Sequence, residues 1–318
     1  MQTFILKRLL QSVLVLLVLT FLVFMVIHIL PGDPLLLYSA QGEIANLDPV
    51  ELDNLRAEFG LDKPLLVQYF VWIFNVFKGD LGKSIFYRDT VIDLLVERMP
   101  VTIHLGLLAI LIGAAAGITF GVICALRRGK IIDTVLTFIA NIGITAPGFW
   151  VGILMIYLFA LQLNWLPTNG YTSPFKDIWM GTRQLVMPVF CLSFFTLASM
   201  ARQTRSSMLE VVRQDYIRTA WAKGLQERVI VTRHVIKNGL IPVITMLGMQ
   251  VRTVFGGSVL IETVFNIPGF GRLMVQSVQA HDYQIVQGGV MVIAAIVLTA
   301  NLLVDLSYGW LDPRIRYN

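Results

Sequence analysis

The chain has 318 residues, of which 56% are hydrophobic and only 14% are charged. Soluble domains contain about 25% charged residues, so this composition excludes an ordinary soluble domain and indicates a membrane protein. The formal net charge is +5. The basic residues cluster beside apolar runs, which is the positive-inside pattern of membrane proteins and not the mark of a nucleic-acid-binding surface.

Long apolar runs set the organisation of the chain, because a helix needs about 20 apolar residues to span a bilayer. Six such runs predict an all-α membrane protein with six transmembrane helices. The fifth run contains Arg252. The six runs are Leu9–Leu30, Met99–Leu126, Thr134–Leu163, Gln184–Ala201, Leu240–Ile261 and Tyr283–Val304.

The first run follows Lys7 and Arg8, as a signal peptide would. It is longer than the apolar core of a signal peptide, about 7 to 15 residues, and no small-residue cleavage motif follows it. We therefore expect it to be retained as a span. A cytoplasmic N-terminus places most of the 25 Lys and Arg residues in cytoplasmic connections, so we expect both termini there.

This topology divides the chain into three parts. Residues 1–30 form the cytoplasmic N-terminus and the first helix, and residues 31–98 form an external segment. Residues 99–318 form a core of five helices, which includes a cytoplasmic loop at residues 202–239.

The stretch GDLGKS at residues 79–84 ends like a phosphate-binding P-loop. A P-loop needs an earlier glycine, where this chain has Phe77, and it needs a strand before it and a helix after it. The predicted topology also places Lys83 outside, away from ATP. We predict an ordinary turn.

Other catalytic or metal-binding patterns are weak. Cys124 and Cys191 fall in separate predicted spans and support neither a metal site nor a disulfide framework. An intramembrane protease would need a serine, such as Ser258, and a histidine at one depth, and nothing identifies His104 as the base. No histidine pair has the spacing of a metal-binding helix. We expect no catalytic residue and no metal site.

The loop at residues 202–239 is too long for a turn and too polar to span. Leu209, Val212, Tyr216 and Ala220 have helical spacing, which predicts one helix that breaks at Gly224. A second helix is predicted from Gln226 to Asn238. A basic amphipathic helix of this kind also suits a membrane surface, and that alternative stays open on the pattern alone.

The loop contains DYIRTAWAKGL at residues 215–225, followed by His234, Asn238 and Pro242. These residues closely resemble the ATPase-coupling loop of ABC importer permeases of the dipeptide, oligopeptide and nickel branch. It extends over nearly the whole chain, through PGDP at 31–34, GDLG at 79–82, TAP at 145–147, ETVF at 262–265, PGFG at 268–271 and DPR at 312–314. The loop shows RTA at 218–220 where the general permease pattern begins Glu-Ala-Ala, which argues against a sugar or phosphate permease.

This resemblance implies the type I ABC importer permease fold, with an extra external segment after the first helix. It also implies a non-catalytic subunit of the bacterial or archaeal cytoplasmic membrane, forming half of a pathway with a second homologous permease. Two separate ATPase subunits would bind ATP and Mg, and an extracytoplasmic solute-binding protein would deliver peptides. The implied coupling residues are Tyr216, Arg218, Thr219, Ala220, Lys223, Gly224 and Leu225.

Polar residues within the predicted spans are candidates for the pathway. Arg252 costs about 2.5 to 3.5 kcal/mol at the centre of a bilayer, so it should face protein or water. Asn141 and Thr145 precede Pro147, which weakens the local backbone ladder. For all three residues, ordinary packing between helices is the alternative.

Two questions stay open at this level. The same machinery serves nickel and oligosaccharides as well as peptides, and selectivity often lies in the binding protein. An ion-coupled secondary transporter is the alternative class. It would typically carry carboxylates inside its spans and repeated halves, whereas the carboxylates here, such as Glu262 and Asp305, lie at the ends of spans.

Overall fold

The computed structural model describes residues 2–29, 50, 56–57 and 61–311, with side chains omitted at residues 2–5, 251–255 and 303–311. These residues divide into two compact units, each of which is described by itself. Unit 1 contains the described residues of Met1–Val101 and Arg272–Leu302, and unit 2 contains Thr102–Gly271 and Leu303–Leu311. The predicted PGDP stretch at 31–34 and the DPR stretch at 312–314 lie outside the described residues.

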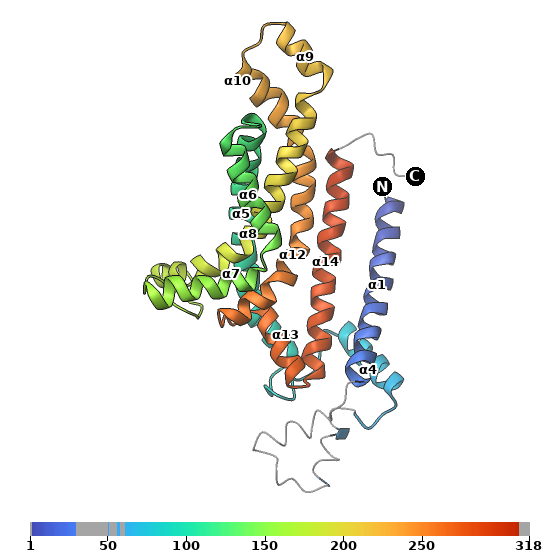
Figure 1. Ribbon diagram of the computed structural model, residues 1–318. Helices are drawn as coiled ribbons and strands as arrows, with labels where there is room; N and C mark the ends of the chain where they lie inside the picture. Colours follow the sequence, from blue (N-terminus) through green and yellow to red (C-terminus); the bar gives the residue numbers. More distant parts are fainter. Residues whose placement is uncertain (1, 30–49, 51–55, 58–60, 312–318) are drawn as a thin grey trace. The chain divides into compact units, whose positions relative to one another are not determined.

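Unit 1 contains the helices at both ends of the chain (Figure 1). Phe24, Tyr69 and Trp72 form one buried cluster, and Ile27, Tyr283 and Val286 form another. These clusters hold the first helix against its neighbours within the unit. Its helices are α1 Gln2–Ile29, α4 Leu65–Phe77, the beginning of α5 Val91–Leu126, most of α13 Phe270–Gln279 and most of α14 Tyr283–Leu311.

Unit 2 is a bundle built around the long helix α8, Ile178–Val212. Glycines allow close packing along α5, since a Cβ added at Gly117 would lie 2.5 Å from the Leu197 carbonyl oxygen. This close approach of small residues is typical of helices in membranes. The other helices are α6 Ile131–Thr145, α7 Gly148–Met155, the π-helical turn η1 Ile156–Gln162, α9 Asp215–Ala222, α10 Glu227–Val229, the π-helical turn η2 Ile230–Ile236, α11 Lys237–Gly239 and α12 Ile241–Val264.

Four described helices are long and apolar enough to cross a membrane, and two bent pairs raise the number to six if each pair is one span. The predicted third span is one of these pairs. It divides at Pro147 into α6 and α7, which meet at an angle of 104°. The single continuous helix expected over Thr134–Leu163 is therefore wrong, because proline lacks the N–H that would continue the backbone ladder.

The GDLGKS stretch is a turn, as predicted. It follows the helix α4 and not a strand, and Lys83 pairs with Thr90 in an isolated antiparallel bridge. Gly79 and Gly82 both have positive φ, which glycine adopts readily. The buried carboxylate of Asp282 accepts hydrogen bonds from Ser84 Oγ (2.5 Å) and from the Phe86 N–H (3.1 Å). Burial raises the pKa of Asp282, and these hydrogen bonds act in the opposite direction.

Candidate functional site

The loop at residues 202–239 forms a helical hairpin at one end of unit 2. The helix α8 continues to Val212, and α9 begins at Asp215 after a break at Gln214. The prediction of one helix from Leu209 to Gly224 is therefore wrong. The predicted second helix is confirmed, since residues Glu227–Gly239 are helical through α10, η2 and α11.

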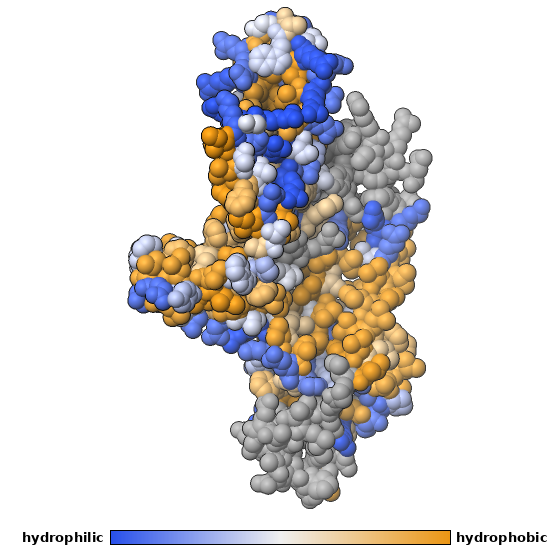
Figure 2. All heavy atoms as spheres, in the orientation of Figure 1, coloured by the Kyte–Doolittle hydropathy of each residue, from blue (hydrophilic) through white to orange (hydrophobic). Residues whose placement is uncertain are grey.

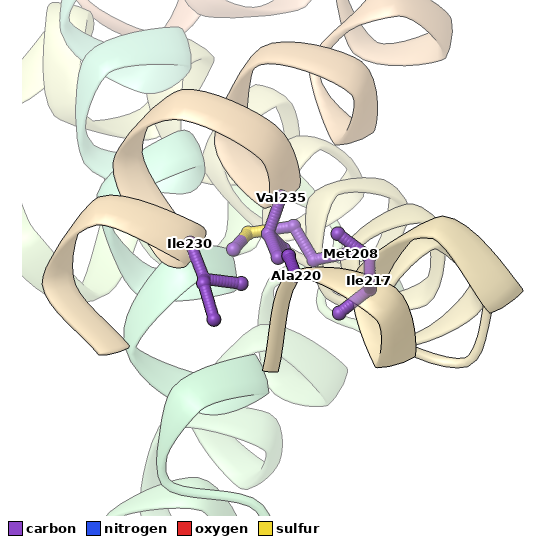
Figure 3. Packing of buried hydrophobic residues seen from close by; sticks show 5 residues of the cluster. All are labelled: Met208, Ile217, Ala220, Ile230 and Val235. Atoms are coloured by element: carbon purple, nitrogen blue, oxygen red, sulfur yellow. The ribbon is translucent and has the colours of Figure 1, made fainter. Parts of the chain in front are cut away.

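The hairpin has a hydrophobic core of its own, which explains the break after α8. Its side chains converge from α8, α9 and the returning helix (Figure 3). The core side chains Ile217 and Ala220 lie three positions apart, on one face of α9. The change of direction at Gln214 turns this face toward α8. The buried residues are Met208, Ile217, Ala220, Ile230 and Val235, and Val122 and Ala125 of α5 pack against them.

The turn after α9 has the hydrogen bonds of a Schellman motif. The Gly224 N–H donates to the Trp221 carbonyl at 3.0 Å, and the Leu225 N–H donates to the Ala220 carbonyl at 3.4 Å. Gly224 has φ +75°, and a Cβ added to it would meet nothing within 4 Å. The prediction of a sharp glycine turn is confirmed, and the turn is open to solvent in this chain.

Large exposed side chains flank the core-facing side of α9 and continue past the turn. Tyr216 is 45% exposed, Trp221 is 49% exposed, and Leu225, beyond the turn, is 39% exposed. Asn238 Nδ2 donates to Tyr216 Oη at 3.3 Å. Figure 2 shows hydrophobic atoms among the hydrophilic surface at this end of unit 2.

Most of the predicted coupling residues share this exposed surface. Arg218, Thr219 and Lys223 are exposed, and the pair between Arg218 Nη1 and Asp215 Oδ1 (3.3 Å) lies in solvent. Ala220 differs, because it is buried in the hairpin core. Its small size is explained by packing within the chain.

Sequence reasoning missed Trp221 as a surface residue. The residue type could have indicated this role, since an exposed tryptophan in a polar loop is typical of a binding anchor. Sequence reasoning also missed the ion pair at the base of the hairpin. Asp133 is buried and accepts from Arg205 Nε (2.8 Å) and Nη2 (2.9 Å), which joins α6 to α8. The signal for this ion pair was Asp133 itself, a single acidic residue that follows the basic residues at 127–130.

The candidate pathway residues occupy different places in unit 2. Asn141 is exposed, accepts from Arg202 Nη2 at 3.1 Å and lines a cavity of about 660 Å³. Thr145 lies at the break between α6 and α7 and lines a second cavity of about 350 Å³. Thr145 Oγ1 hydrogen-bonds the Asn141 carbonyl at 3.0 Å. Arg252 lies within α12, and its side chain is outside the described residues.

A buried carboxylate fixes the PGFG stretch after α12. Glu262 accepts from Thr102 Oγ1 at 2.6 Å, and the same hydroxyl accepts from the Phe270 N–H at 2.8 Å. Gly269 and Gly271 pack directly on Glu262, where a Cβ would lie 2.4 and 3.0 Å from its carboxyl atoms. This arrangement accounts for both glycines and gives Glu262 a structural role.

The apolar helices, the two bent pairs and the hairpin define a class of protein, the multi-pass membrane permeases with the type I ABC importer fold. Solved structures of an amino acid ABC transporter and of the methionine ABC transporter MetNI, each 17% identical, share this fold. Their TM-scores are 0.52 and 0.57, and the matches cover 67% and 69% of this chain and 92% and 96% of theirs.

The family follows from the sequence comparisons. Residues 1–106 match the N-terminal model of binding-protein-dependent transport system membrane components, and residues 117–317 match the inner membrane component model. The chain belongs to this family of transport system inner membrane components. Full-length relatives include a putative peptide transport system permease protein of Brucella abortus (strain 2308), 41% identical over 100% of both chains, and the dipeptide transport system permease protein DppB of Escherichia coli (strain K12), 38% identical over 100% of this chain and 99% of the relative.

Proposed function

We propose that the chain is the permease subunit of an ATP-driven importer of di- or oligopeptides. In this proposal it forms half of the pathway with a second permease, and a solute-binding protein delivers the peptide from outside. Both termini and the hairpin at 202–239 lie in the cytoplasm. The peptide assignment is supported by the names of full-length relatives at 38 to 41% identity. Nickel and oligosaccharides are the alternative cargoes.

One observation supports the coupling role above all: α9 exposes large side chains while the hairpin that carries it has its own hydrophobic core. A hairpin that buries Ile217 and Ala220 internally keeps its shape when a force acts on its outer surface. Tyr216, Trp221 and Leu225 then provide an aromatic and apolar contact, with Arg218 and Lys223 at its rim. Two separate ATPase subunits would hold ATP and Mg, and each would receive one such hairpin in a groove.

The substitution Gly224→Asp tests this proposal in the assembled transporter. The added side chain meets nothing in this chain, so the helices should still insert. In a docked turn, the same side chain and the strain of a positive φ would oppose binding. We expect normal membrane abundance, weakened retention of the ATPase subunits during purification, and peptide uptake reduced by about tenfold or more.

The matched control is Gly79→Asp, because Gly79 also has a positive φ (+85°) and open space around it. It lies in unit 1, which holds no part of the proposed coupling surface. This control should retain its ATPases and its uptake. Normal uptake and ATPase retention in Gly224→Asp would instead favour the membrane-surface helix as the role of this loop.

A further inference from the structure

The helix α4 in unit 1 is apolar but too short to cross a bilayer. Its 13 residues extend about 20 Å, against about 30 Å for the hydrocarbon core. One face carries large apolar side chains that are 56 to 78% exposed. The surface over α1 and α4 is accordingly hydrophobic in Figure 2. These exposed residues are Leu66, Phe70, Phe74 and Phe77.

The opposite face of α4 packs against the membrane-spanning part of α1. Tyr69 and Trp72 are buried against Phe24, and Tyr69 Oη donates to the Leu17 carbonyl at 3.0 Å. Leu17 lies within the candidate span Leu6–Ile29, about 18 Å from its end at Ile29. The Tyr69 hydroxyl therefore reaches the middle of this candidate span, and acyl chains would cover an apolar face at this depth when the span lies in a bilayer.

A polar cavity of about 600 Å³ lies beside α4 in the same unit. Lys63 and Lys83 line it, together with Gln68 and Asn75. Asp80 also lines it, but one oxygen of its carboxylate accepts the Gly82 N–H at 2.8 Å. Gln68 Nε2 already donates to the Lys63 carbonyl at 2.7 Å, but the two lysines outnumber the single carboxylate of the lining, which suits an anion.

Three buried polar atoms at this cavity have no hydrogen-bond partner in the described part of the chain. They are Trp72 Nε1, Gln284 Oε1 and Gln287 Nε2. Leaving such an atom unsatisfied costs about 1 to 3 kcal/mol, so buried polar groups are normally paired. The Gln287 side chain can turn toward the cavity, where its amide group would donate to a bound anion.

We propose that this cavity binds the phosphate headgroup of an anionic phospholipid from the surrounding bilayer. The anionic phosphate would accept from the two lysines, from Trp72 Nε1 and from the Gln287 amide, whereas Phe70 and Phe74 lie on the far face of α4 and would contact other lipids. Basic side chains beside an interfacial helix are typical of headgroup recognition. The GDLGKS turn thereby gains a role as one wall of the site. This inference holds for either orientation of the chain and does not rest on peptide transport.

Retention of lipid by the purified full chain tests the proposal, measured by native mass spectrometry with added phosphatidylglycerol. The double variant Lys63→Gln/Lys83→Gln should retain at least about tenfold less of this lipid, because charge-assisted hydrogen bonds are lost. Trp72→Phe replaces the indole with a smaller aromatic ring that has no N–H, and it should weaken retention by about fivefold. Lys78→Gln is the matched control and should behave like the wild type, since Lys78 lies over the Phe74 ring and does not line the cavity.

Phosphatidylglycerol should also raise the melting midpoint of the wild type and of Lys78→Gln, but not that of the double variant. If the double variant does not fold, Lys83→Gln alone serves, with a smaller loss of retention. Diacylglycerol, which lacks the phosphate, should bind the wild type weakly and equally in all variants. Retention unchanged by both lysine substitutions overturns the proposal. Displacement of the lipid by inorganic phosphate would show a small-anion site instead, and displacement by the dipeptide Ala-Ala would show a peptide site.

Discussion

Two glycine turns in this chain share a backbone conformation but differ in their surroundings. Gly82 has φ +89° and Gly224 has φ +75°, both in the left-handed region. A Cβ at Gly82 would lie 2.8 Å from Gln284 Oε1, whereas a Cβ at Gly224 would meet nothing within 4 Å. The first turn is packed within its own unit, and the second presents an open surface. A glycine in an open turn with exposed aromatic neighbours is the better candidate for contact with another subunit.

The largest effect on stability is expected in the hydrophobic core of the hairpin that carries the Gly224 turn. Ile217 is 1% exposed, so Ile217→Ala should destabilise the hairpin by about 2 to 5 kcal/mol through lost burial and a cavity. Hydrogen exchange of the amides at residues 215–239 should become faster, while exchange in α1 stays unchanged. Thr219→Ala, at an exposed position of the same helix, is the control. Unchanged exchange in Ile217→Ala would mean that the hairpin does not depend on its own core.

The next effect concerns the packed turn. Asp282→Ala removes the acceptor of Ser84 Oγ and of the Phe86 N–H. Leaving these donors buried and unpaired should cost about 1 to 3 kcal/mol, seen as a lower melting midpoint and faster exchange at residues 84–86. Asp80→Ala, at an exposed carboxylate that accepts one N–H, should cost less. Equal effects of the two substitutions would show that Asp282 does not fix this turn.

The membrane spans show how much of the fold the sequence predicts. Apolar runs predicted the spans because burial in lipid requires a certain length and composition, and both can be read from the sequence. The 104° angle of the break at Pro147 could not be predicted from the sequence. A proline signals that the ladder is interrupted, but the angle depends on how the two halves pack against the rest of the bundle.

The hairpin shows a similar limit. Helical spacing of Leu209, Val212, Tyr216 and Ala220 predicted one helix, because local periodicity does not reveal where a chain changes direction. The break at Gln214 follows from tertiary packing, in which Met208 and Ile217 must share one core. The glycine turn at Gly224 was predictable, since a positive φ is a local demand of the residue itself. The helix α4 was missed because its apolar run is shorter than a span.

Alanine substitutions at Gly82 and Gly224 should have smaller effects on stability, and they compare the two turns directly. Gly224→Ala should cost about 1 kcal/mol, the strain of a Cβ at positive φ. Gly82→Ala should cost up to about 1 kcal/mol more, because the amide of Gln284 has to move aside. The difference in melting midpoint should disappear in a Gln284→Ala background, where the obstructing group is absent. A difference that persists there would place the strain in the backbone and not in the packing.

The smallest effect is expected at Lys83, on the binding of nucleotide. We expect Lys83→Ala to leave the ATP affinity of the assembled transporter unchanged, measured by equilibrium binding with and without Mg. In a P-loop, the backbone N–H groups face the phosphates and the serine hydroxyl binds the metal. Here the Gly82 N–H donates to Asp80, and the Ser84 hydroxyl donates to Asp282. Both groups are engaged within the chain, and the helix α4 precedes the turn where a P-loop has a strand. Weaker ATP binding in a folded, fully assembled Lys83→Ala complex would show that this turn contacts nucleotide after all, and the packed turn would then be a second functional surface.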